Sequence, residues 1–265
     1  DFDLSITSRQ ETHQIELNNF KITSYHFTDD KFDSSIDKKL KEANYILISI
    51  PPIEGKDIVA KYFDKNLQGI TNCKWITYLS ATSVYGNHNG EWVNEKSKTK
   101  PTSINGTSRL KVENEWFKLS EENNLPLQIF RLSGIYSHQH NVLKRLKTGE
   151  VKIINKKDHF FSRIHVEDIA NALFKSLDNF KKGEIYNISD DRPASSKEVI
   201  MYGIKLLGVD KPQTIEVNEI ENEMLKNFYK DSKKVDNKKM KEFFSFKLKY
   251  PTYIEGLNYI FNNTI

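Results

Sequence analysis

Apolar residues follow two alternating patterns along most of the chain. Continuous runs, such as residues 45–50 and 75–79, predict strands of a parallel sheet that is covered on both faces. Stretches with apolar residues three or four positions apart predict helices, and the clearest of these is 166–177. Because strands alternate with helices, the pattern predicts an α/β fold with a Rossmann-type parallel sheet and helices on both faces.

The predicted elements can be placed by residue number. The expected strands are 3–7, 21–27, 45–50, 75–79, 125–132, 151–154 and 184–188. The expected helices are 34–43, 54–65, 105–120, 142–146, 166–177, 219–228, 236–244 and 252–261. One further helix opens with a capping box, Ser195 and Glu198, and is closed by Gly208. In such a fold, ligands bind beyond the carboxyl ends of the strands.

The composition is that of a soluble globular protein, and it excludes several kinds of site. Among 40 basic and 36 acidic side chains, the Lys-rich stretch 233–249 is interpreted as a solvated helical face and not as a nucleic-acid patch. Cys73 is the only cysteine, so the chain can form neither an intrachain disulfide nor a cysteine metal cluster. No apolar run reaches the ~20 residues of a membrane span. The acidic start at Asp1 does not resemble a signal peptide, so we expect a cytoplasmic protein.

Small hydroxyl side chains follow the apolar run 75–79. Ser80, Thr82 and Ser83 come directly after it, and Tyr85 follows within two residues. Two interpretations remain open for them. They are either site hydroxyls at the ligand-binding edge of the sheet, or residues that only bond the backbone where a strand ends.

The histidines do not predict a metal site. His138 and His140 form a His-x-His pair, but the sequence shows no third ligand near them. His165 stands at the start of the predicted helix 166–177, where a packed residue is more common than a ligand. We therefore expect no metal.

Four motifs occur in the order and at the spacing of one enzyme family. They are 79–86 (similar to S-S-x-x-V-Y-G), 131–136 (similar to R-x-x-x-x-Y-G), 163–169 (similar to H-V-D-D) and 185–188 (similar to Y-N-[VI]). Over roughly residues 40–205, the chain resembles the extended short-chain dehydrogenase/reductases, also called the NAD-dependent epimerase/dehydratase family. Within that family it most resembles an atypical subgroup, often labelled nucleoside-diphosphate-sugar epimerase, whose catalytic motif is degenerate.

The resemblance implies an NAD(P)-dependent epimerase, dehydratase or reductase that acts on a nucleotide-sugar-like substrate or on another carbonyl or hydroxyl compound. The alternative is a non-catalytic NAD(P)-binding protein of the same fold. The resemblance also implies an NAD(P)-binding domain of residues 1–136 and 163–208, and a small substrate-side lobe of 137–162 and 209–265. The expected partner is a small-molecule substrate, with a homodimer left open and with neither nucleic acid nor membrane.

The chain departs from the family at its start. The family opens with a central strand and a G-x-G-x-x-G turn that holds the pyrophosphate, and the 265 residues contain no such motif. Residues 1–9 resemble the second strand instead, and a missing first strand would leave a gap of about 10 Å in the sheet. We therefore expect a first βα unit of ~20–25 residues to precede Asp1. Without that unit, we expect the chain to bind dinucleotide weakly or not at all.

The catalytic positions depart as well. The family uses a Ser or Thr after the fifth strand and a Y-x-x-x-K motif on the next helix, whose Lys lowers the pKa of the Tyr. These three slots fall on Ala81, Asn105 and Arg109. An amide cannot act as a base, and a guanidinium cannot be deprotonated. Proton transfer is therefore expected from water or from a nearby hydroxyl: Thr82, Ser83 or Tyr85.

The remaining site residues follow from the same resemblance. The implied cofactor contacts are Ser8, Arg9, Ser49, Ile50, Pro51, Ser80, Ala81, Arg109 and Gly134. The implied substrate contacts are Thr82, Asn105 and Arg163. Because an Arg near the end of the second strand accommodates the 2′-phosphate of NADP, Arg9 favours NADP over NAD.

Overall fold

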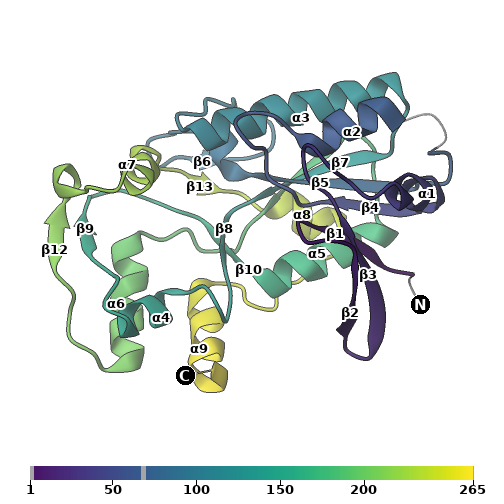
Figure 1. The fold of residues 1–265 in the computed structure, drawn as a ribbon. Coiled ribbons are helices and arrows are strands. Elements are labelled where there is room, and N and C mark those ends of the chain that lie inside the picture. Colours follow the sequence, from purple (N-terminus) through teal and green to yellow (C-terminus); the bar gives the residue numbers. More distant parts are fainter. Residues whose placement is uncertain (1–2, 67–69, 265) are drawn as a thin grey trace.

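A four-stranded parallel sheet forms the centre of the molecule (Figure 1). The computed structural model describes residues 3–66 and 70–264. The strand order is β11-β7-β5-β4, and every neighbouring pair is parallel. The strands are β4 (Tyr45–Ile48), β5 (Trp75–Ala81), β7 (Leu127–Leu132) and β11 (Ile185–Ile188). All four were predicted from their apolar runs, and the α/β class is confirmed.

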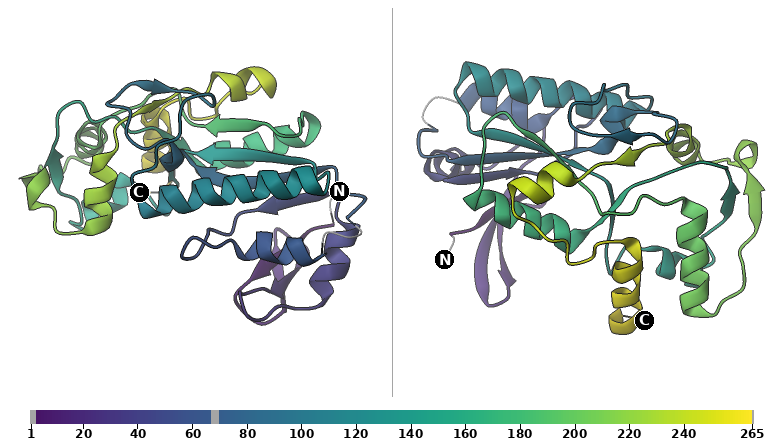
Figure 2. Two further views of the ribbon diagram at one scale, coloured as in Figure 1. Left: turned by 90° about the horizontal axis from the view of Figure 1, so that it is seen from above. Right: turned by 180° about the vertical axis from the view of Figure 1, so that it is seen from behind.

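Helices cover both faces of this sheet and enclose two apolar cores. On one face lie α2 (Ile58–Asn66) and α3 (Ile104–Glu122), which pack with β4, β5 and β7 around the buried Trp116. Figure 2 shows α3 running along the sheet. On the other face, α5 (Val166–Asp178) and α8 (Lys238–Phe243) pack around Phe130 and Tyr186. Within the described ranges, no helix combines the length and the apolar character needed to cross a bilayer.

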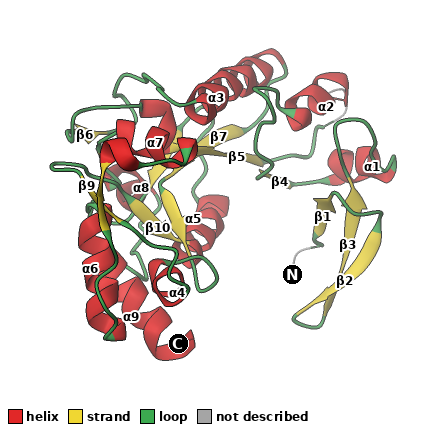
Figure 3. Ribbon diagram, turned by 60° about the vertical axis from the view of Figure 1, so that its left-hand side comes forward, coloured by secondary structure: helices red, strands yellow, loops and turns green. Residues whose placement is uncertain are grey.

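The N-terminal residues form a separate small sheet, which stands beyond β4 in Figure 3. Its strands are β1 (Ser5–Ser8), β2 (His13–Leu17) and β3 (Phe20–His26), and helix α1 (Ser35–Glu42) follows. β1 pairs with β3 in parallel, whereas β2 and β3 form an antiparallel hairpin. The hairpin turns at Asn18 and Asn19, which both have positive φ, as a two-residue type I′ turn requires. The sequence prediction missed β2.

β4 is less covered than its sequence predicted. Tyr45 and Leu47 are 42% and 47% exposed, whereas Ile48, on the opposite face, is 2% exposed. Tyr45 lies beside Trp75 in the register, and the Trp75 indole N–H donates to Ser176 of α5 at 3.1 Å. Helix α5 therefore covers β5 on this face, while the same face of β4 stays open. The expectation of two covered faces was wrong for this strand.

Helix α2 begins later than predicted. Residues 54–57 form a turn in which Glu54 and Gly55 have positive φ, so these residues cannot continue a helix. The side chain of Asp57 then caps the helix, because its Oδ1 accepts the N–H groups of Val59 and Ala60 at 2.8 Å each. The helix predicted over 54–65 therefore starts at Ile58.

The remaining elements form a lobe beside the sheet. Its helices are α4 (Val142–Lys147), α6 (Ser196–Leu207), α7 (Glu223–Lys230) and α9 (Tyr253–Thr264). Three short parallel strand pairs connect distant segments: β8 (Gly134–Tyr136) with β10 (Arg163–His165), β9 (Ile153–Asn155) with β12 (Thr214–Glu216), and β6 (Trp92–Val93) with β13 (Lys234–Val235). Short 3-10 helices lie at η1 (Thr82–Tyr85) and η2 (Val217–Glu219).

Helix α6 has the ends that the sequence predicted. The Ser195 hydroxyl accepts the N–H of Glu198 at 3.0 Å, and Gly208 ends the helix in the left-handed conformation. The helix packs on α4, β9 and α9, so it lies among the lobe elements, whereas α8 packs against the sheet. The division of the chain into two domains stays a prediction.

Candidate functional site

The carboxyl ends of three central strands meet in one row of polar residues. Ser80 of β5, Arg131 of β7 and Asn187 of β11 are direct neighbours in the register. Glu113 of α3 reaches this row from the face above it. The carboxylate of Glu113 accepts two hydrogen bonds from Arg131, from Nε at 3.0 Å and Nη2 at 2.6 Å, and one from Ser80 Oγ at 2.5 Å. All four residues are buried, so Ser80, a predicted cofactor contact, contributes to a buried ion pair.

Tyr85 is buried and contacts the same row of polar residues. Its side chain is fully buried, and its hydroxyl donates to Asn187 Oδ1 at 2.7 Å. The guanidinium of Arg131 lies over the ring, 4.9 Å from the centroid. Burial raises the pKa of Tyr85 to about 12, so the phenol is protonated near neutral pH. These contacts give Tyr85 a packing role, and we do not assign proton transfer to it.

The hydroxyls of η1 lie against the start of α3. Thr82 is buried, and Ser83 is half-buried. A Cβ at Gly106 would lie 2.6 Å from the carbonyl oxygen of Ser83, so only glycine permits this approach between α3 and η1. Asn105, one residue earlier, is exposed. The structure thus brings the backbone of η1 to the helix start that carries Asn105.

Arg109 points back toward the end of β5. Its Nη1 donates to the carbonyl oxygen of Leu79 at 2.6 Å and to the hydroxyl of Tyr78 at 3.1 Å. Ala81, the residue in the predicted Ser/Thr slot, is half-buried two positions further along. The guanidinium therefore binds a strand-end carbonyl, which is a structural use of the position where the resemblance places a lysine.

Asp57 is a buried acid that the sequence prediction passed over. Its Oδ1 caps α2, but its Oδ2 has no hydrogen-bond partner among the described residues. Burial raises the pKa of this carboxyl. The signal was present in the sequence, because an Asp directly before an amphipathic run is a typical N-cap.

The cofactor contacts predicted near the first strands remain near the surface. Arg9, which follows β1, and Ser49 and Pro51, which follow β4, are all exposed. Ser8 is half-buried and its hydroxyl accepts from Ser24 at 2.9 Å, while Ile50 packs against the core below α2. These five residues therefore lie just beyond two strand ends, which is where a dinucleotide fold binds its ligand.

Gly134 has a structural reason to be glycine. It is paired with Arg163 between β8 and β10, and a Cβ there would lie 2.4 Å from the ring of Phe161. No side chain fits in that space unless the ring moves. Phe161 therefore accounts for the glycine at this position, whether or not a cofactor also approaches it.

A cavity of about 920 Å³ opens among the lobe elements. We call it the lobe cavity, and its wall is formed by β8, α4, α6, α7, α9 and the segments around β9 and β12. Aromatic side chains, among them Tyr136, Phe161 and Tyr253, supply much of the wall. The size is that of a small-molecule site, and its wall combines apolar with polar and charged side chains.

Arg163 is the cation in the wall of the lobe cavity. Its Nη1 donates to the carbonyl oxygens of Phe161 at 2.9 Å and Ala194 at 3.0 Å, and its guanidinium lies 5.0 Å from the centroid of the Phe161 ring. Three exposed basic residues, Lys144, Arg145 and Lys152, also line the cavity, and so do three exposed acidic ones, Glu150, Glu219 and Glu221, which, with Arg163 counted, leaves one positive charge in excess. The cavity can therefore receive a molecule that carries an anionic group. Of the three predicted substrate contacts, only Arg163 is among the described lining residues.

Asp190 is a buried carboxyl close to Arg163. Its backbone N–H donates to the carbonyl oxygen of Arg163 at 2.7 Å, and its Oδ2 has no hydrogen-bond partner among the described residues. Burial raises the pKa of Asp190 to about 8, while the nearby Arg163 acts against that rise. The carboxyl therefore titrates near neutral pH. The sequence analysis did not single it out, because the motif that marks this strand ends at Ile188, two residues before Asp190.

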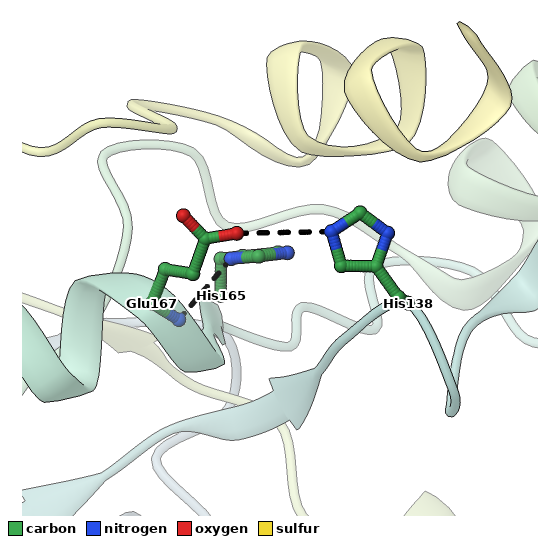
Figure 4. A group of neighbouring side chains, drawn as sticks. All are labelled: His138, His165 and Glu167. Atoms are coloured by element: carbon green, nitrogen blue, oxygen red, sulfur yellow. Dashed lines mark hydrogen bonds and ion pairs between the residues drawn. The ribbon is translucent and has the colours of Figure 1, made fainter. Parts of the chain in front are cut away.

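The two histidines of the His-x-His pair have different neighbours in the structure. His140 is exposed and lines the lobe cavity, whereas His138 lies with His165 and Glu167 at the start of α5 (Figure 4). The nearby ligand candidates come from 27 and 29 residues further along the chain, so spacing within the His-x-His motif gave no sign of them.

Comparison with known proteins assigns the family. A model of the NAD dependent epimerase/dehydratase family matches residues 59–189, from α2 to the end of β11. A solved structure of a functionally unknown conserved protein from Silicibacter pomeroyi DSS is 36% identical, over 82% of this chain and 77% of that one, with a TM-score of 0.78. The chain belongs to the NAD dependent epimerase/dehydratase family.

Other similar proteins match this chain at lower sequence identity or over a shorter stretch. Protein YeeZ of Escherichia coli (strain K12) is 31% identical over 143 residues, which are 52% of this chain and 48% of that protein. The chain thus spans about half the length of the curated relatives that it matches. The UDP-glucuronic acid 4-epimerase of Bacillus cereus, solved with UDP-glucuronic acid and NAD, is 17% identical over 91% of this chain and 81% of that one, with a TM-score of 0.69. At that identity it shows the shared fold alone.

Proposed function

We propose that this protein binds NAD(P) and acts on a nucleotide-sugar-like molecule, or on another carbonyl or hydroxyl compound, as an epimerase, dehydratase or reductase with atypical catalytic residues. The observation that carries the proposal is the lobe cavity with Arg163 in its wall. Membership of the epimerase/dehydratase family supports the cofactor, and a structure of the same fold from Bacillus cereus contains both NAD and UDP-glucuronic acid.

The charge of the lobe cavity suits a sugar nucleotide. A diphosphate carries negative charge and several acceptor oxygens, and an arginine is the side chain best shaped to bind them. Two hydrogen bonds hold Nη1 of Arg163 against carbonyl oxygens, so the guanidinium keeps its place before a ligand arrives. The aromatic wall would then pack against the apolar faces of the base or sugar.

The adenosine half of the cofactor would lie at the carboxyl ends of β1 and β4. NAD(P), when bound, accepts and returns a hydride. The exposed Arg9, Ser49 and Pro51 fit a role in holding its adenosine half, with Ser8, Ile50, Ala81, Arg109 and Gly134 as further proposed contacts. Arg9 would pair with a 2′-phosphate, so NADP is the proposed cofactor in preference to NAD.

Proton transfer is assigned to the η1 hydroxyls and to water. Ser83 is half-buried beside the exposed Asn105, and Thr82 lies one residue before it. In this assignment, Thr82 or Ser83 would hold the substrate hydroxyl or pass its proton to water, and Asn105 would bind a polar group of the substrate. Tyr85 takes no part in this step, because its hydroxyl donates a hydrogen bond to Asn187. The cytoplasmic location and the homodimer stay predictions.

One observation favours a second candidate function, in which the protein binds NAD(P) without catalysis. Arg109 occupies the predicted lysine slot, yet its guanidinium binds the Leu79 carbonyl oxygen at 2.6 Å. A cation held there cannot lower the pKa of a tyrosine base, and the tyrosine slot itself carries Asn105. In this case the protein would still bind NAD(P) but would no longer catalyse a reaction.

The binding proposal is tested by titrating UDP-glucuronic acid into the protein by isothermal calorimetry. We expect saturable binding at one site. Arg163→Lys keeps the charge but loses the planar fork, so affinity should fall by about tenfold, the equivalent of ~1.4 kcal/mol. Lys234→Arg is the control, because Lys234 also lies over an aromatic ring, Phe160, and both residues are outside the described cavity lining. Equal affinity of the wild type and Arg163→Lys would contradict the assignment.

Turnover separates the two candidate functions. A panel of UDP- and dTDP-sugars is incubated with the protein and NADP⁺ or NAD⁺, and the sugar products are separated by chromatography, because epimerisation and dehydration return the hydride and leave the cofactor oxidised. Reductase activity is followed by the absorbance of NADPH or NADH, and Thr82→Ala and Tyr85→Phe are the variants. An atypical enzyme should lose turnover in Thr82→Ala and keep it in Tyr85→Phe. Cofactor binding without turnover on the whole panel would instead support the non-catalytic protein.

A further inference from the structure

Three potential metal ligands meet where the β8–α4 loop passes the start of α5. They are His138 from the loop, His165 at the N-cap of α5, and Glu167 from its first turn. One ligand atom from each residue can be chosen so that all three lie within 4.8 Å of one another. Figure 4 shows the side chains of His138 and Glu167 pointing toward one another, with the His165 ring beside the line that joins them.

His165 supplies a buried nitrogen that this fold leaves unused. The residue is fully buried, and its Nδ1 accepts the backbone N–H of Glu167 at 3.2 Å. Its Nε2 is buried as well and has no hydrogen-bond partner among the described residues. Burial lowers the pKa of His165 to about 4, so the imidazole is neutral at physiological pH. A buried polar atom without a partner is costly, and this one lies beside two further metal-ligating side chains.

His138 and Glu167 complete the group from the solvent side. His138 Nε2 lies 3.7 Å from Glu167 Oε1, and each of the two side chains is 34% exposed. The other oxygen of Glu167, Oε2, pairs with Lys249 Nζ at 2.6 Å. This contact is the largest cause that lowers the pKa of Glu167, so its carboxylate is ionised. Oε1 faces the imidazole of His138 and also accepts a hydrogen bond from the Tyr250 hydroxyl at 3.3 Å.

We propose that His138, His165 and Glu167 bind a divalent transition-metal ion, for which Zn²⁺ is the best match. Two imidazole nitrogens and one carboxylate oxygen form a ligand set that zinc accepts, with a fourth position left for water. The same set is unsuited to Mg²⁺, which prefers oxygen ligands. This site is separate from the lobe cavity and does not depend on the proposed function.

Binding would require small movements. Ligand bonds of about 2.0–2.1 Å in a tetrahedron place ligand atoms roughly 3.3 Å apart, so atoms that lie within 4.8 Å of one another must close in by up to about 1.5 Å. His138 lies in a loop and both solvent-side groups are partly exposed, so they have room to move. Coordination through Nε2 places the ring proton of His165 on Nδ1, and the 3.2 Å cap bond from Glu167 opens. Glu167 would then share its two oxygens between Lys249 and the ion.

A bound ion would connect two parts of the molecule. His138 belongs to the loop that leads into the lobe, and α5 covers the central sheet. The ring of His138 also lies 5.2 Å from that of Tyr259 on α9. Coordination would therefore fix the loop, α5 and α9 relative to one another and stabilise the folded protein.

The site is tested by calorimetric titration of ZnCl₂, and in parallel of MgCl₂, into tag-free protein. We expect one saturable Zn²⁺ site and none for Mg²⁺. His138→Ala and Glu167→Gln should each weaken Zn²⁺ binding by more than about tenfold, the loss already typical of outer-shell partners. His140→Ala is the matched control, because His140 lies in the same loop but outside the group, and it should bind Zn²⁺ as the wild type does.

A thermal-unfolding scan with and without Zn²⁺ gives a second readout. Zn²⁺ should raise the Tm of the wild type and of His140→Ala, and should leave the Tm of His138→Ala unchanged. Both solvent-side variants change partly exposed residues, so their folding is checked by the metal-free Tm. The proposal is overturned if Zn²⁺ does not bind the wild type saturably, or if His138→Ala and Glu167→Gln bind it with unchanged affinity.

Discussion

Glu113 shows why individual site residues are hard to assign from sequence. Its carboxylate accepts hydrogen bonds from Ser80, 33 positions earlier, and from Arg131, 18 positions later. The sequence placed Tyr85 correctly just after a buried strand, whereas Ser80 proved to be the last residue but one of that strand. Spacing alone cannot tell whether a hydroxyl at a strand end points toward a ligand or toward a buried partner. That choice depends on side chains from α3 and β11, which are distant in the sequence.

His159 provides a prediction at this scale. It is 2% exposed, and neither ring nitrogen has a hydrogen-bond partner among the described residues. Burial lowers its pKa from 6.5 to about 4. Between these values the unfolded chain binds a proton that the folded protein does not, so stability is fully present above pH 6.5 and falls as the pH drops toward 4. The slope for one proton is at most about 1.4 kcal/mol per pH unit.

The measurement is urea unfolding of the wild type and His159→Phe between pH 4 and 7. His159→Phe should lose less stability on acidification, because one of the buried rings that must become protonated is gone. His165, whose pKa is also about 4, leaves part of the dependence in place. The exposed His140→Ala should follow the wild type. Parallel curves for the wild type and His159→Phe would show that His159 does not carry this effect.

At the scale of elements, long apolar patterns were reliable and short pairings were not. The four central strands and helices α3, α5, α6 and α9 lie where periodicity and capping residues placed them. The two- and three-residue strands β6, β8, β10, β12 and β13 were missed, because each is defined by a partner far away in the chain. Asp57 likewise moved the start of α2, since its cap bond outweighs the helical pattern before it. The open face of β4 was missed for a similar reason, because whether a strand is covered depends on elements that are distant in the sequence.

Two adjacent residues of β4 test that open face. Leu47 is 47% exposed and Ile48 is 2% exposed, on opposite faces of one strand. Ile48→Ala should lower the free energy of unfolding by about 2–5 kcal/mol, because it leaves a cavity in the core below α2. Leu47→Ala should lower it by about 1 kcal/mol or less. Equal losses, measured by urea unfolding, would contradict an uncovered β4 and would indicate that another element packs on Leu47.

At the scale of the whole molecule, the site is formed by segments that lie far apart in the sequence and share no local motif. The lobe cavity takes its wall from β8, α4, α6, α7 and α9, which extend over about half of the chain. Family resemblance predicted the fold, the cofactor class and one cavity residue, Arg163. It did not predict the cavity itself, because its shape depends on how α6 and α9 pack on the loop after β8. The predicted glycine turn before Asp1 stays a prediction.

The most direct test of the account is to locate the ligand by NMR. A ¹H–¹⁵N correlation spectrum of labelled protein is recorded during titration with UDP-glucuronic acid. The account predicts saturable shifts of the amides in β8, α4 and β10, including Tyr136 and Arg163, and little change in the small sheet of β1–β3. Saturable shifts confined to other parts of the molecule, or none at millimolar ligand, would contradict the claim that the lobe cavity binds a nucleotide-sugar-like molecule.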